Sequence, residues 1–590
     1  MKFSGAERQA NLGRLASEPF DVLVIGGGIT GAGVALDAAS RGLHTALVER
    51  GDFAAGTSSR SSKLVHGGLR YLNQREFRLV YEALAERQRL LRLAPHLVRP
   101  LPFLIPIFAS GTAGKAGARA YARAIGVALW MYDATGGARI GKLHRRLSRA
   151  ETLERMPDLN PERLAAGFLY YDARVDDARL TLAVVKTAAS HGAVVANYVE
   201  ATGLRRIGEQ VRGAALTDRL DRAAFEVDAK VVINAAGVWA DELRALDEGR
   251  NPGSLRPAKG VHITLPAGRP HLEVAAVLPV PRDRRSVFVI PWGERVYVGT
   301  TDTDYDGPLD EPTCTAADVD YLLGALNAWM RHPVDRSEVL GSWAGLRPLV
   351  SGPPGAGGAP GRRATGRTAD LSRRHSVRVS PSGLVSIVGG KLTTYRKMAA
   401  DAVDEALDVR RAAGDRPPGV GRSRTASVPL FGAEGYEEGA APGAAERLGI
   451  AGDVLEHLAG RHGGQARTVT AMVVEDPALA EPLVSGLPYL AAEAVYAIRY
   501  EMALTLEDVL SRRTRALLLD TAAAVAAAPS VADLMAGELG WSPDETARQV
   551  AAFTALAERQ RRAADPAEAA VEASVLYGLP GDAPIPGLSG

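Results

Sequence analysis

The segment Asp21–Gly33 constrains the fold of this chain more than any other. Its four apolar residues, Val22–Ile25, predict a buried strand of the kind found in parallel sheets. Gly26, Gly28 and Gly31 follow in G-x-G-x-x-G spacing at the start of a predicted helix. The first glycine permits a tight turn, the second lets a pyrophosphate approach the backbone, and the third allows close packing of helix on strand. Because free N–H groups at a helix start attract phosphates, the segment predicts a dinucleotide-binding unit.

A second strand and an acidic residue complete this unit. Thr45–Val48 predicts a neighbouring strand, and Glu49 follows it directly. A carboxylate at this place accepts a hydrogen bond from a ribose hydroxyl and disfavours a cofactor with a 2′-phosphate. The residues assigned here to the cofactor site are Gly26, Gly28, Gly31, Glu49 and its neighbour Arg50.

Two distant segments favour FAD over NAD as the ligand. Val231–Trp239 predicts a buried strand that ends in a turn of small residues, and Leu384–Arg396 predicts a strand, a glycine turn and a helix start. A ligand that contacts both turns and the first glycines is long and enclosed, as an extended FAD is. The chain has no second strand–GxGxxG–helix unit for a nicotinamide nucleotide. FAD is therefore the predicted cofactor.

Composition excludes several other classes of protein. Cys314 is the single cysteine of 590 residues, so this chain alone cannot build a disulfide framework, a zinc cage or an iron–sulfur cluster. Lys and Arg number 70 against 68 acids, which gives no bulk attraction to nucleic acid. We see no secretory signal in the first twenty residues and no uninterrupted apolar run long enough to span a membrane. We expect a globular protein with an organic redox cofactor and no metal site.

Further motifs resemble the FAD-dependent, respiratory glycerol-3-phosphate dehydrogenase family. They are Thr57–Tyr71 (TSSRSSKLVHGGLRY), Val175–Leu180, Lys259–His262, Phe288–Gly293, Gly299–Asp302, Gly345–Pro348 and Gly389–Arg396. A later segment, Arg499–Thr514, is similar to the helical tail domain of that family. The resemblance implies an α/β fold in which a Rossmann-like FAD domain, of the glutathione-reductase or D-amino-acid-oxidase type, is interlaced with an antiparallel-sheet substrate domain. An α-helical C-terminal domain follows.

The resemblance also implies a reaction. Members of the family transfer a hydride from C2 of sn-glycerol 3-phosphate to flavin N5, form dihydroxyacetone phosphate and pass the electrons to a membrane quinone. Such chemistry needs convergent cations for the phosphate, a group that takes the proton of the C2 hydroxyl, and a cover that excludes water.

Three cations in these motifs are candidates for the phosphate clamp, namely Lys63, Arg347 and Lys391. An arginine can hold two phosphate oxygens at once, and Lys391 opens a helix at a glycine turn. Structural ion pairing is the alternative for Lys63 and Arg347. Arg373 and Arg374 are further candidates, for which a solvated loop is the stronger interpretation.

His262 is the predicted base, because an imidazole titrates near physiological pH. A histidine with a purely structural role is the alternative. We assign His262, Lys391 and Arg347 to catalysis, and the same three residues with Lys63 and Thr393 to substrate binding.

The remaining motif residues are assigned to the flavin. These are Thr57, Ser58, Ser59, His66, Gly67, Ala236, Gly237, Gly389, Gly390, Leu392 and Thr393. A histidine such as His66 tethers FAD covalently in some flavoproteins, but the family resembled here generally binds it non-covalently. We therefore predict that denaturation releases free FAD. No acid–histidine spacing supports a serine hydrolase.

We predict one interlaced body over residues 1–409, because strands of the nucleotide site come from both of its ends. The FAD segments are about 18–80, 170–250 and 345–409, and the substrate-cap segments are about 81–169 and 251–344. Within the cap, the alternating residues of Arg285–Pro291 and Glu294–Gly299 predict paired strands.

The rest of the chain divides by composition. Residues 410–429 are rich in Arg, Gly and Pro and predict a linker. Residues 430–565 have helical periodicity and predict a helical domain, and residues 566–590 predict a flexible tail.

A basic segment, residues 111–149, is a candidate membrane contact. It carries eight basic residues and one acid, Asp133, with Arg119 and Arg123 one helical turn apart and aromatic residues such as Trp130 between them and the acid. This composition fits an anionic membrane surface near the quinone. A basic solvated hairpin is the alternative. We expect a cytoplasmic protein, peripheral on the inner face of the cell membrane, and the sequence leaves monomer and homodimer open.

Four functions follow in order of support. A quinone-linked glycerol-3-phosphate dehydrogenase comes first, and a glycerol-3-phosphate oxidase that reduces oxygen to peroxide comes second. An amine or amino-acid oxidase would need a carboxylate clamp rather than several phosphate-binding cations. A non-catalytic flavin-binding module would show no bleaching of the flavin by substrate.

Overall fold

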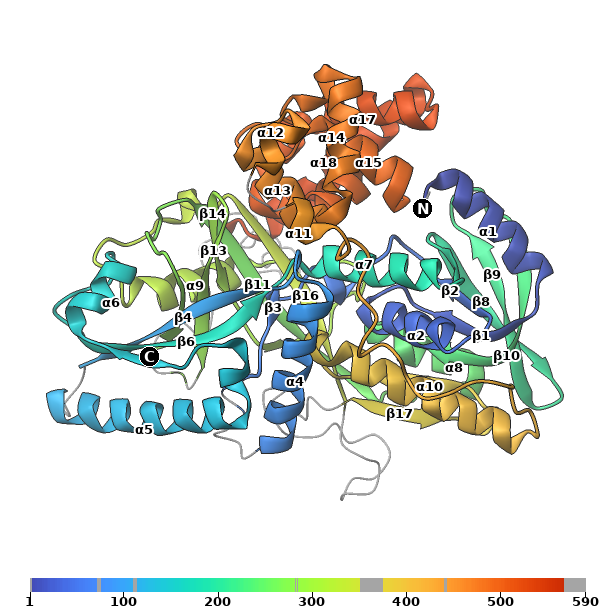
Figure 1. Cartoon of the computed structure of the whole chain (residues 1–590), viewed down its shortest axis with the longest axis horizontal. Coiled ribbons are helices and arrows are strands. Elements are labelled where there is room, and N and C mark those ends of the chain that lie inside the picture. Colours follow the sequence, from blue (N-terminus) through green and yellow to red (C-terminus); the bar gives the residue numbers. More distant parts are fainter. Residues whose placement is uncertain are drawn as a thin grey trace, which may run out of the picture.

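A largely parallel sheet forms one half of the body (Figure 1). The computed structural model describes residues 3–69, 71, 76–109, 114–281, 283, 285–350, 375–439 and 443–566. Within these residues the sheet has eight strands: β1 (Phe20–Ile25), β2 (Thr45–Val48), β7 (Val194–Ala196), β8 (Val199–Ile207), β9 (Gln210–Asp218), β10 (Ala224–Asn234), β17 (Ser376–Val379) and β18 (Val385–Val388). The strand β1 lies between β10 and β2 and runs parallel to both, which explains why successive residues of β1 are apolar.

Helices cover both faces of this sheet. On one face α2 (Ile29–Ser40) contacts α7 (Asp177–Ser190) and α10 (Tyr395–Ala412), and the three helices share a core with the strands. On the other face α1 (Gly5–Ser17) packs with the β8–β9 hairpin and with Leu243 of α8 (Ala240–Glu248).

A mostly antiparallel sheet forms the other half of the body. Its ten described strands are β3 (Leu64–Val65), β4 (Arg99–Phe108), β5 (Arg145–Leu147), β6 (Leu164–Arg174), β11 (Leu255–Pro266), β12 (Ala275–Pro279), β13 (Ser286–Trp292), β14 (Arg295–Gly299), β15 (Thr303–Asp304) and β16 (Gly341–Val350). The pairing predicted for the two alternating segments is confirmed, because β13 and β14 are antiparallel neighbours. The helices of this half are α4 (Phe77–Leu93), α5 (Gly114–Thr135), α6 (Arg149–Arg155) and α9 (Ala316–Asn327).

Strand pairing moves two of the predicted segment boundaries. The strand β3 lies inside the first predicted FAD segment, yet it pairs with β6 in the antiparallel sheet. The strand β16 crosses the predicted boundary at residue 345 and pairs along its whole length with β11. Helix α10 also continues to Ala412, three residues into the predicted linker. The two boundaries at β3 and β16 differ from the prediction because backbone hydrogen bonds across a sheet leave no local trace in composition.

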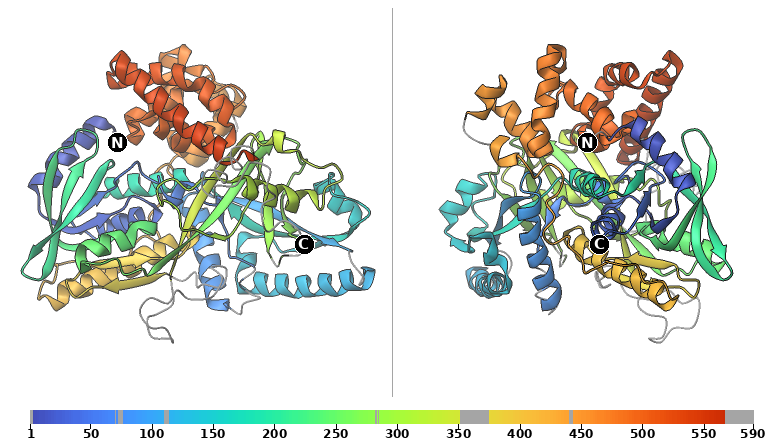
Figure 2. Two further views of the ribbon diagram at one scale, coloured as in Figure 1. Left: turned by 180° about the vertical axis from the view of Figure 1, so that it is seen from behind. Right: turned by 45° about the vertical axis from the view of Figure 1, so that its right-hand side comes forward.

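The helical C-terminal domain packs on top of the body in the view of Figure 1, and Figure 2 shows the same domain from behind and from one side. Its helices are α11 (Tyr436–Gly439), α12 (Ala444–Leu448), α13 (Gly452–His462), α14 (Ala466–Glu475), α15 (Ala491–Glu501), a π-helical segment (Asp508–Arg513), α16 (Ala516–Leu519), α17 (Thr521–Leu539) and α18 (Pro543–Ala563). Among the described residues, α17 is the one helix long and apolar enough to span a membrane by length and composition. Ala528, Ala532 and Met535 on one side of α17 are buried in a core shared with α15 and α18.

Two sets of predicted residues lie outside the described part of the chain. These are the alternative clamp residues Arg373 and Arg374 and the predicted tail from residue 567 onward.

Candidate active site

The nucleotide end of the site is built from backbone where parallel strands end. Strands β1, β2, β10 and β18 present their carboxyl ends at the same edge of the sheet, the place where open α/β sheets bind ligands. Gly26 follows β1 with φ of +116°, and a Cβ at Gly31 would lie 1.8 Å from the carbonyl oxygen of Gly26. The first turn therefore excludes side chains at both positions.

The start of α2 faces a second loop of the first family motif. Gly28 is the N-cap residue and supplies no capping side chain. Ser58 provides the cap instead, since its Oγ accepts a hydrogen bond from Ile29 N at 2.9 Å. Thr57 of the same 3-10 turn donates to the carbonyl oxygen of Leu346 at 2.6 Å. The loop thus joins the start of α2 to β16.

Glu49 stands at the end of β2 as predicted. Its carboxylate accepts hydrogen bonds from Gly27 N at 2.6 Å and from Gly51 N at 2.8 Å. Burial raises the pKa of Glu49, although both backbone donors oppose the rise. Arg50 turns away toward the surface, where its guanidinium lies 4.4 Å from the ring centre of Trp239.

The later turns meet the same edge. Gly237 follows β10 with φ of +61°, and no atom of the described residues lies within 4 Å of the place its Cβ would take. Gly389 and Gly390 follow β18 with φ of +78° and +81°, a run that favours glycine. At the turn after them Thr393 Oγ1 accepts a hydrogen bond from His66 N at 3.3 Å.

The residues at this edge fit an FAD. The close approach that Gly26 and Gly31 permit, the first turn of α2 and the acid at the end of β2 match the needs of a pyrophosphate and a ribose. Of the other assigned residues, Ala236 and Leu392 lie at the β10 and β18 turns. Ser59 and Gly67 lie on either side of β3, and Gly67 N donates to Tyr132 OH at 3.1 Å.

His262 occupies a buried position on β11. Only 2% of the residue is exposed, its Nε2 lies 2.8 Å from Ser62 Oγ, and its ring stacks on Trp343 at 4.7 Å with 8° between the planes. A Cβ at Gly299 on the neighbouring strand would lie 2.0 Å from the imidazole, so glycine makes room for it. Nδ1 is buried, and no hydrogen bond from the described residues reaches it.

Electrostatics keep this imidazole neutral. Burial lowers the pKa of His262 well below its usual value, and the positive charges of Lys63 and Arg347 lower it further.

Arg347 lies on the same face of the sheet as His262. Strand β16 pairs Trp343 with His262, and Arg347 follows four residues later on the same side. A Cβ at Gly260 would lie 2.4 Å from the Arg347 guanidinium, so this glycine admits the arginine toward the histidine. The guanidinium donates to Asp302 Oδ1 at 3.1 Å.

Lys391 and Lys63 differ in their surroundings. The ammonium of Lys391 lies 3.9 Å from the ring centre of Tyr71, at the turn after β18. The ammonium of Lys63 donates to Asp177 Oδ1 at 3.0 Å and to Ser59 O at 3.1 Å, and its side chain is buried. For Lys63 this geometry favours the structural alternative, an ion pair, over the direct substrate contact that we predicted.

Sequence reasoning missed the partners of this ion pair. Asp177 lies in a recognised motif, and Arg515 follows another directly, but nothing in their local sequence joins them. Arg515 from the helical domain donates to Asp177 and, at 2.7 Å, to Ser59 O. Lys63 and Arg515 thus share the Asp177 carboxylate beneath the loop Ser59–Lys63, which contacts His262 through Ser62.

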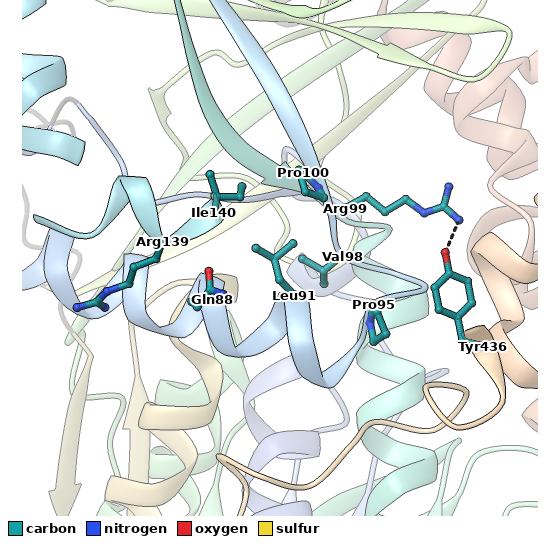
Figure 3. Close-up of a pocket in the computed structure, with 9 residues that line it drawn as sticks. All are labelled: Gln88, Leu91, Pro95, Val98, Arg99, Pro100, Arg139, Ile140 and Tyr436. Atoms are coloured by element: carbon teal, nitrogen blue, oxygen red, sulfur yellow. Dashed lines mark hydrogen bonds between the residues drawn. The ribbon is translucent and has the colours of Figure 1, made fainter. Parts of the chain in front are cut away.

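A surface pocket elsewhere on the body contains none of the predicted site residues. It has a volume of about 530 Å³ and lies among α4, β4 and α11. Figure 3 shows Gln88 and Leu91 of α4 on one side and Arg99, whose guanidinium donates to Tyr436 OH at 3.3 Å, on the other. The candidate active site is therefore not this pocket.

Comparison with known proteins matches two families along the chain. Residues 21–396 match the model of the FAD dependent oxidoreductase family, and residues 423–546 match that of the C-terminal domain of alpha-glycerophosphate oxidase. The chain is 44% identical to a glycerol-3-phosphate dehydrogenase 2 of Mycobacterium bovis over 94% of this chain and 91% of that protein. It is 39% identical to the mitochondrial glycerol-3-phosphate dehydrogenase of Mus musculus over 91% of this chain and 73% of that protein.

A solved structure extends the comparison to the fold. The glycerol-3-phosphate dehydrogenase of Bacillus halodurans, determined as a complex with FAD, superposes with a TM-score of 0.73 at 33% identity. The match covers 95% of this chain and 99% of that one. The predicted FAD cofactor, the interlaced α/β body and the helical C-terminal domain are confirmed.

Proposed function

This chain belongs to the FAD-dependent glycerol-3-phosphate dehydrogenase family, and we propose that it oxidises sn-glycerol 3-phosphate to dihydroxyacetone phosphate at the site around His262. The observation that carries the proposal is the buried imidazole itself. It is fixed by Ser62 and Trp343, kept neutral, and left with a ring nitrogen that no described residue engages.

His262 acts as the base that takes the proton of the C2 hydroxyl. In the tautomer in which Nε2 donates to Ser62 Oγ, the lone pair that accepts this proton is on Nδ1. A bound phosphate dianion near the histidine raises its pKa again, because opposite charge favours the imidazolium. The FAD, when bound, supplies the acceptor for the C2 hydride at N5.

Arg347 and Lys391 are the proposed phosphate ligands. Arg347 keeps part of its side chain exposed, while Asp302, Thr300 and Thr301 accept the hydrogen bonds that orient its guanidinium. The exposed part of this guanidinium is the proposed contact to a substrate oxygen. Lys391 stands at the β18 turn beside Tyr71, and with Thr393 it completes the predicted substrate contacts.

We propose a membrane quinone as the electron acceptor, and a peripheral contact on the inner face of the cell membrane through α5. This helix bears Arg119 and Arg123 on its exposed side, and next to them Tyr121, Val127 and Trp130 are 49%, 61% and 61% exposed. Exposed aromatic and basic residues on one helix suit the boundary of an anionic bilayer.

Anaerobic addition of glycerol 3-phosphate tests the reaction. The flavin absorbance near 450 nm should bleach with glycerol 3-phosphate and stay constant with glycerol, which lacks the phosphate. A quinone analogue should restore the colour faster than oxygen does. Faster recovery with oxygen, with peroxide released, would favour the oxidase instead, and an unbleached flavin would remove both functions.

Liposome recovery tests the membrane contact. The pair of substitutions Arg119→Glu and Arg123→Glu should lower binding to vesicles of anionic phospholipid while dye-linked oxidation remains. The pair Arg548→Glu and Arg562→Glu on the exposed face of α18 is the matched double charge reversal. Equal vesicle binding by the two variants would contradict a role for α5.

A further inference from the structure

The helical domain places a buried arginine beneath the loop Ser59–Lys63. Arg515 is 1% exposed and immediately precedes α16 with φ of +86°, a left-handed conformation that is strained for a side-chain-bearing residue. Its Nη2 donates to Asp177 and to Ser59 O, and its Nη1 donates to Ser511 O at 3.1 Å. Strain of this kind persists where surrounding contacts determine one position, and it concentrates at functional sites.

Asp177 ties the rest of the loop to this arginine. Its Oδ1 accepts from Lys63, and its Oδ2 accepts from Ser61 N at 2.9 Å and from Ser61 Oγ at 2.7 Å. Lys63 has φ of +54°, so the loop ends in a second left-handed residue. Three of the five loop residues are therefore bonded to this pair, Ser59 to Arg515 and both Ser61 and Lys63 to Asp177.

The same part of the helical domain also contacts the strands beside His262. The carbonyl oxygen of Leu518 accepts a hydrogen bond from Thr264 Oγ1 at 2.8 Å, two residues from the histidine on β11. A Cβ at Gly341 of β16 would lie 2.4 Å from that same oxygen. Helix α16 is thus in direct contact with both strands of the site.

The loop held by Arg515 carries contacts to both halves of the active site. Immediately before it, Ser58 caps α2 at the nucleotide edge. Within it, Ser62 Oγ lies 2.8 Å from His262 Nε2, and the Ser61 carbonyl oxygen accepts from Trp343 Nε1 at 3.2 Å. A displacement of this loop would move the imidazole relative to the cofactor edge.

We propose that Arg515 is a positioning residue for the oxidation, and that the helical domain completes the active site through it. The inference rests on the proposed function of the His262 site. Arg515 touches neither substrate nor cofactor in this scheme. It fixes the Ser59–Lys63 loop, which orients His262 through Ser62.

The charges of Lys63, Asp177 and Arg515 agree with this role. Burial and the neighbouring Arg515 charge lower the pKa of Lys63 to about 8, while Asp177 and Asp176 oppose the change. A neutral residue at 515 would leave Asp177 with one cation in place of two, so the loop would lose both a bond and part of its charge balance.

Arg515→Gln in the full-length holoenzyme tests the proposal against Arg179→Gln. Arg179 is the matched control, because it is a buried guanidinium that joins the body to the helical domain by donating to Glu501 at 2.5 Å. Among the described residues, its side-chain hydrogen bonds go to the helical domain and none goes to the loop. Both variants should lose thermal stability. Arg515→Gln alone should lower kcat and the anaerobic bleaching rate by about tenfold or more, because small misplacements of reacting groups are costly. Its KM and FAD content should stay within about twofold of those of Arg179→Gln, because a loss confined to the chemical step leaves binding unchanged.

Equal kcat values in the two variants, or a loss that follows FAD content, would overturn the proposal while leaving the reaction in place. If Arg515→Gln is not recovered folded, Arg515→Lys is compared with Arg179→Lys instead. Arg515→Lys should then lower kcat by about threefold relative to Arg179→Lys, because an ammonium keeps the charge without the planar pair of donors. A wild-type protein that glycerol 3-phosphate does not bleach would overturn the proposed function and this inference together.

Discussion

The nucleotide edge and the His262 site are built in opposite ways. At the edge, three glycines and the start of α2 bring main-chain groups within reach of a phosphate, and one carboxylate completes the arrangement. At the His262 site, side chains from two neighbouring strands and one loop enclose a single imidazole. The edge is disrupted when atoms are added to the backbone, whereas the His262 site is disrupted when one side chain is removed. Substitutions in the two regions should therefore produce different defects.

The largest effect on the rate should come from a substitution at the His262 site. His262→Gln removes the base, and general-base catalysis contributes about 10²–10⁴-fold to a rate, so kcat should fall within that range. FAD content should remain normal, because the nucleotide edge is unchanged. Stopped-flow bleaching and dye-linked turnover give the rate, with His191→Gln at the exposed end of α7 as the control. A kcat within threefold of that control would exclude His262 as the base.

The edge should respond to a single methyl group. Gly31→Ala places a Cβ 1.8 Å from the Gly26 carbonyl oxygen, which backbone movement must relieve. A cost of 2–3 kcal/mol corresponds to about 100-fold weaker FAD binding, measured as the flavin-to-protein absorbance ratio during dialysis. Gly13→Ala is the control, since Gly13 also lies inside a helix, α1, and among the described residues no atom lies within 4 Å of its Cβ position. Full FAD retention by Gly31→Ala would contradict the assigned cofactor turn.

Arg347→Lys should separate substrate binding from the chemical step at the His262 site. The lysine keeps the charge and loses the planar pair of donors, so KM for glycerol 3-phosphate should rise by about tenfold with a smaller change in kcat. Steady-state kinetics measure both constants. Arg256→Lys, on the neighbouring strand and paired with Asp304, should leave KM unchanged. Equal KM values for Arg347→Lys and Arg256→Lys would give Arg347 the structural role that its bond to Asp302 also allows.

The smallest effect is one of stability against pH. The folded pKa of His262 lies well below its usual value of about 6.5, so the unfolded chain binds the extra proton first as the pH falls. The wild-type protein should therefore lose about 1 kcal/mol of stability between pH 6.5 and 5.5 that His262→Gln does not lose. Urea unfolding of both holoenzymes at the two pH values measures the difference. An equal loss of unfolding free energy in the wild-type protein and in His262→Gln would show that the imidazole is charged in the folded protein.

The two regions also differ in how far they could be predicted. The glycines, Glu49 and the strands β1 and β2 follow one another within thirty residues, and each was recognisable because its spacing alone specifies the turn. His262 was recognised only through its motif. Its contact with Ser62 joins residues 200 positions apart, and no local pattern predicts that distance.

Lys63 and Arg515 show the same limit for charged groups. The sequence placed Lys63 among the substrate ligands, since a cation in a family motif suits a phosphate. The structure pairs it with Asp177, and the second cation on that carboxylate comes from 338 residues away. Ion pairs are satisfied by whichever opposite charge packing brings near, so composition and spacing cannot choose among 68 acidic residues.

The amino-acid sequence was sufficient to specify the dinucleotide turn, the FAD cofactor, the paired strands of the cap and the helical C-terminal domain. The turn, the paired strands and the helical domain depend on residues a few positions apart, whose geometry the backbone fixes directly. FAD was distinguished from NAD by two distant turns, each of which is itself a local pattern. The tertiary structure alone decided that α16 lies against β11 and β16, and that Arg515 and Lys63 share Asp177. Those contacts depend on how whole layers pack, because burial removes water and leaves each buried charge to find its partner across the fold.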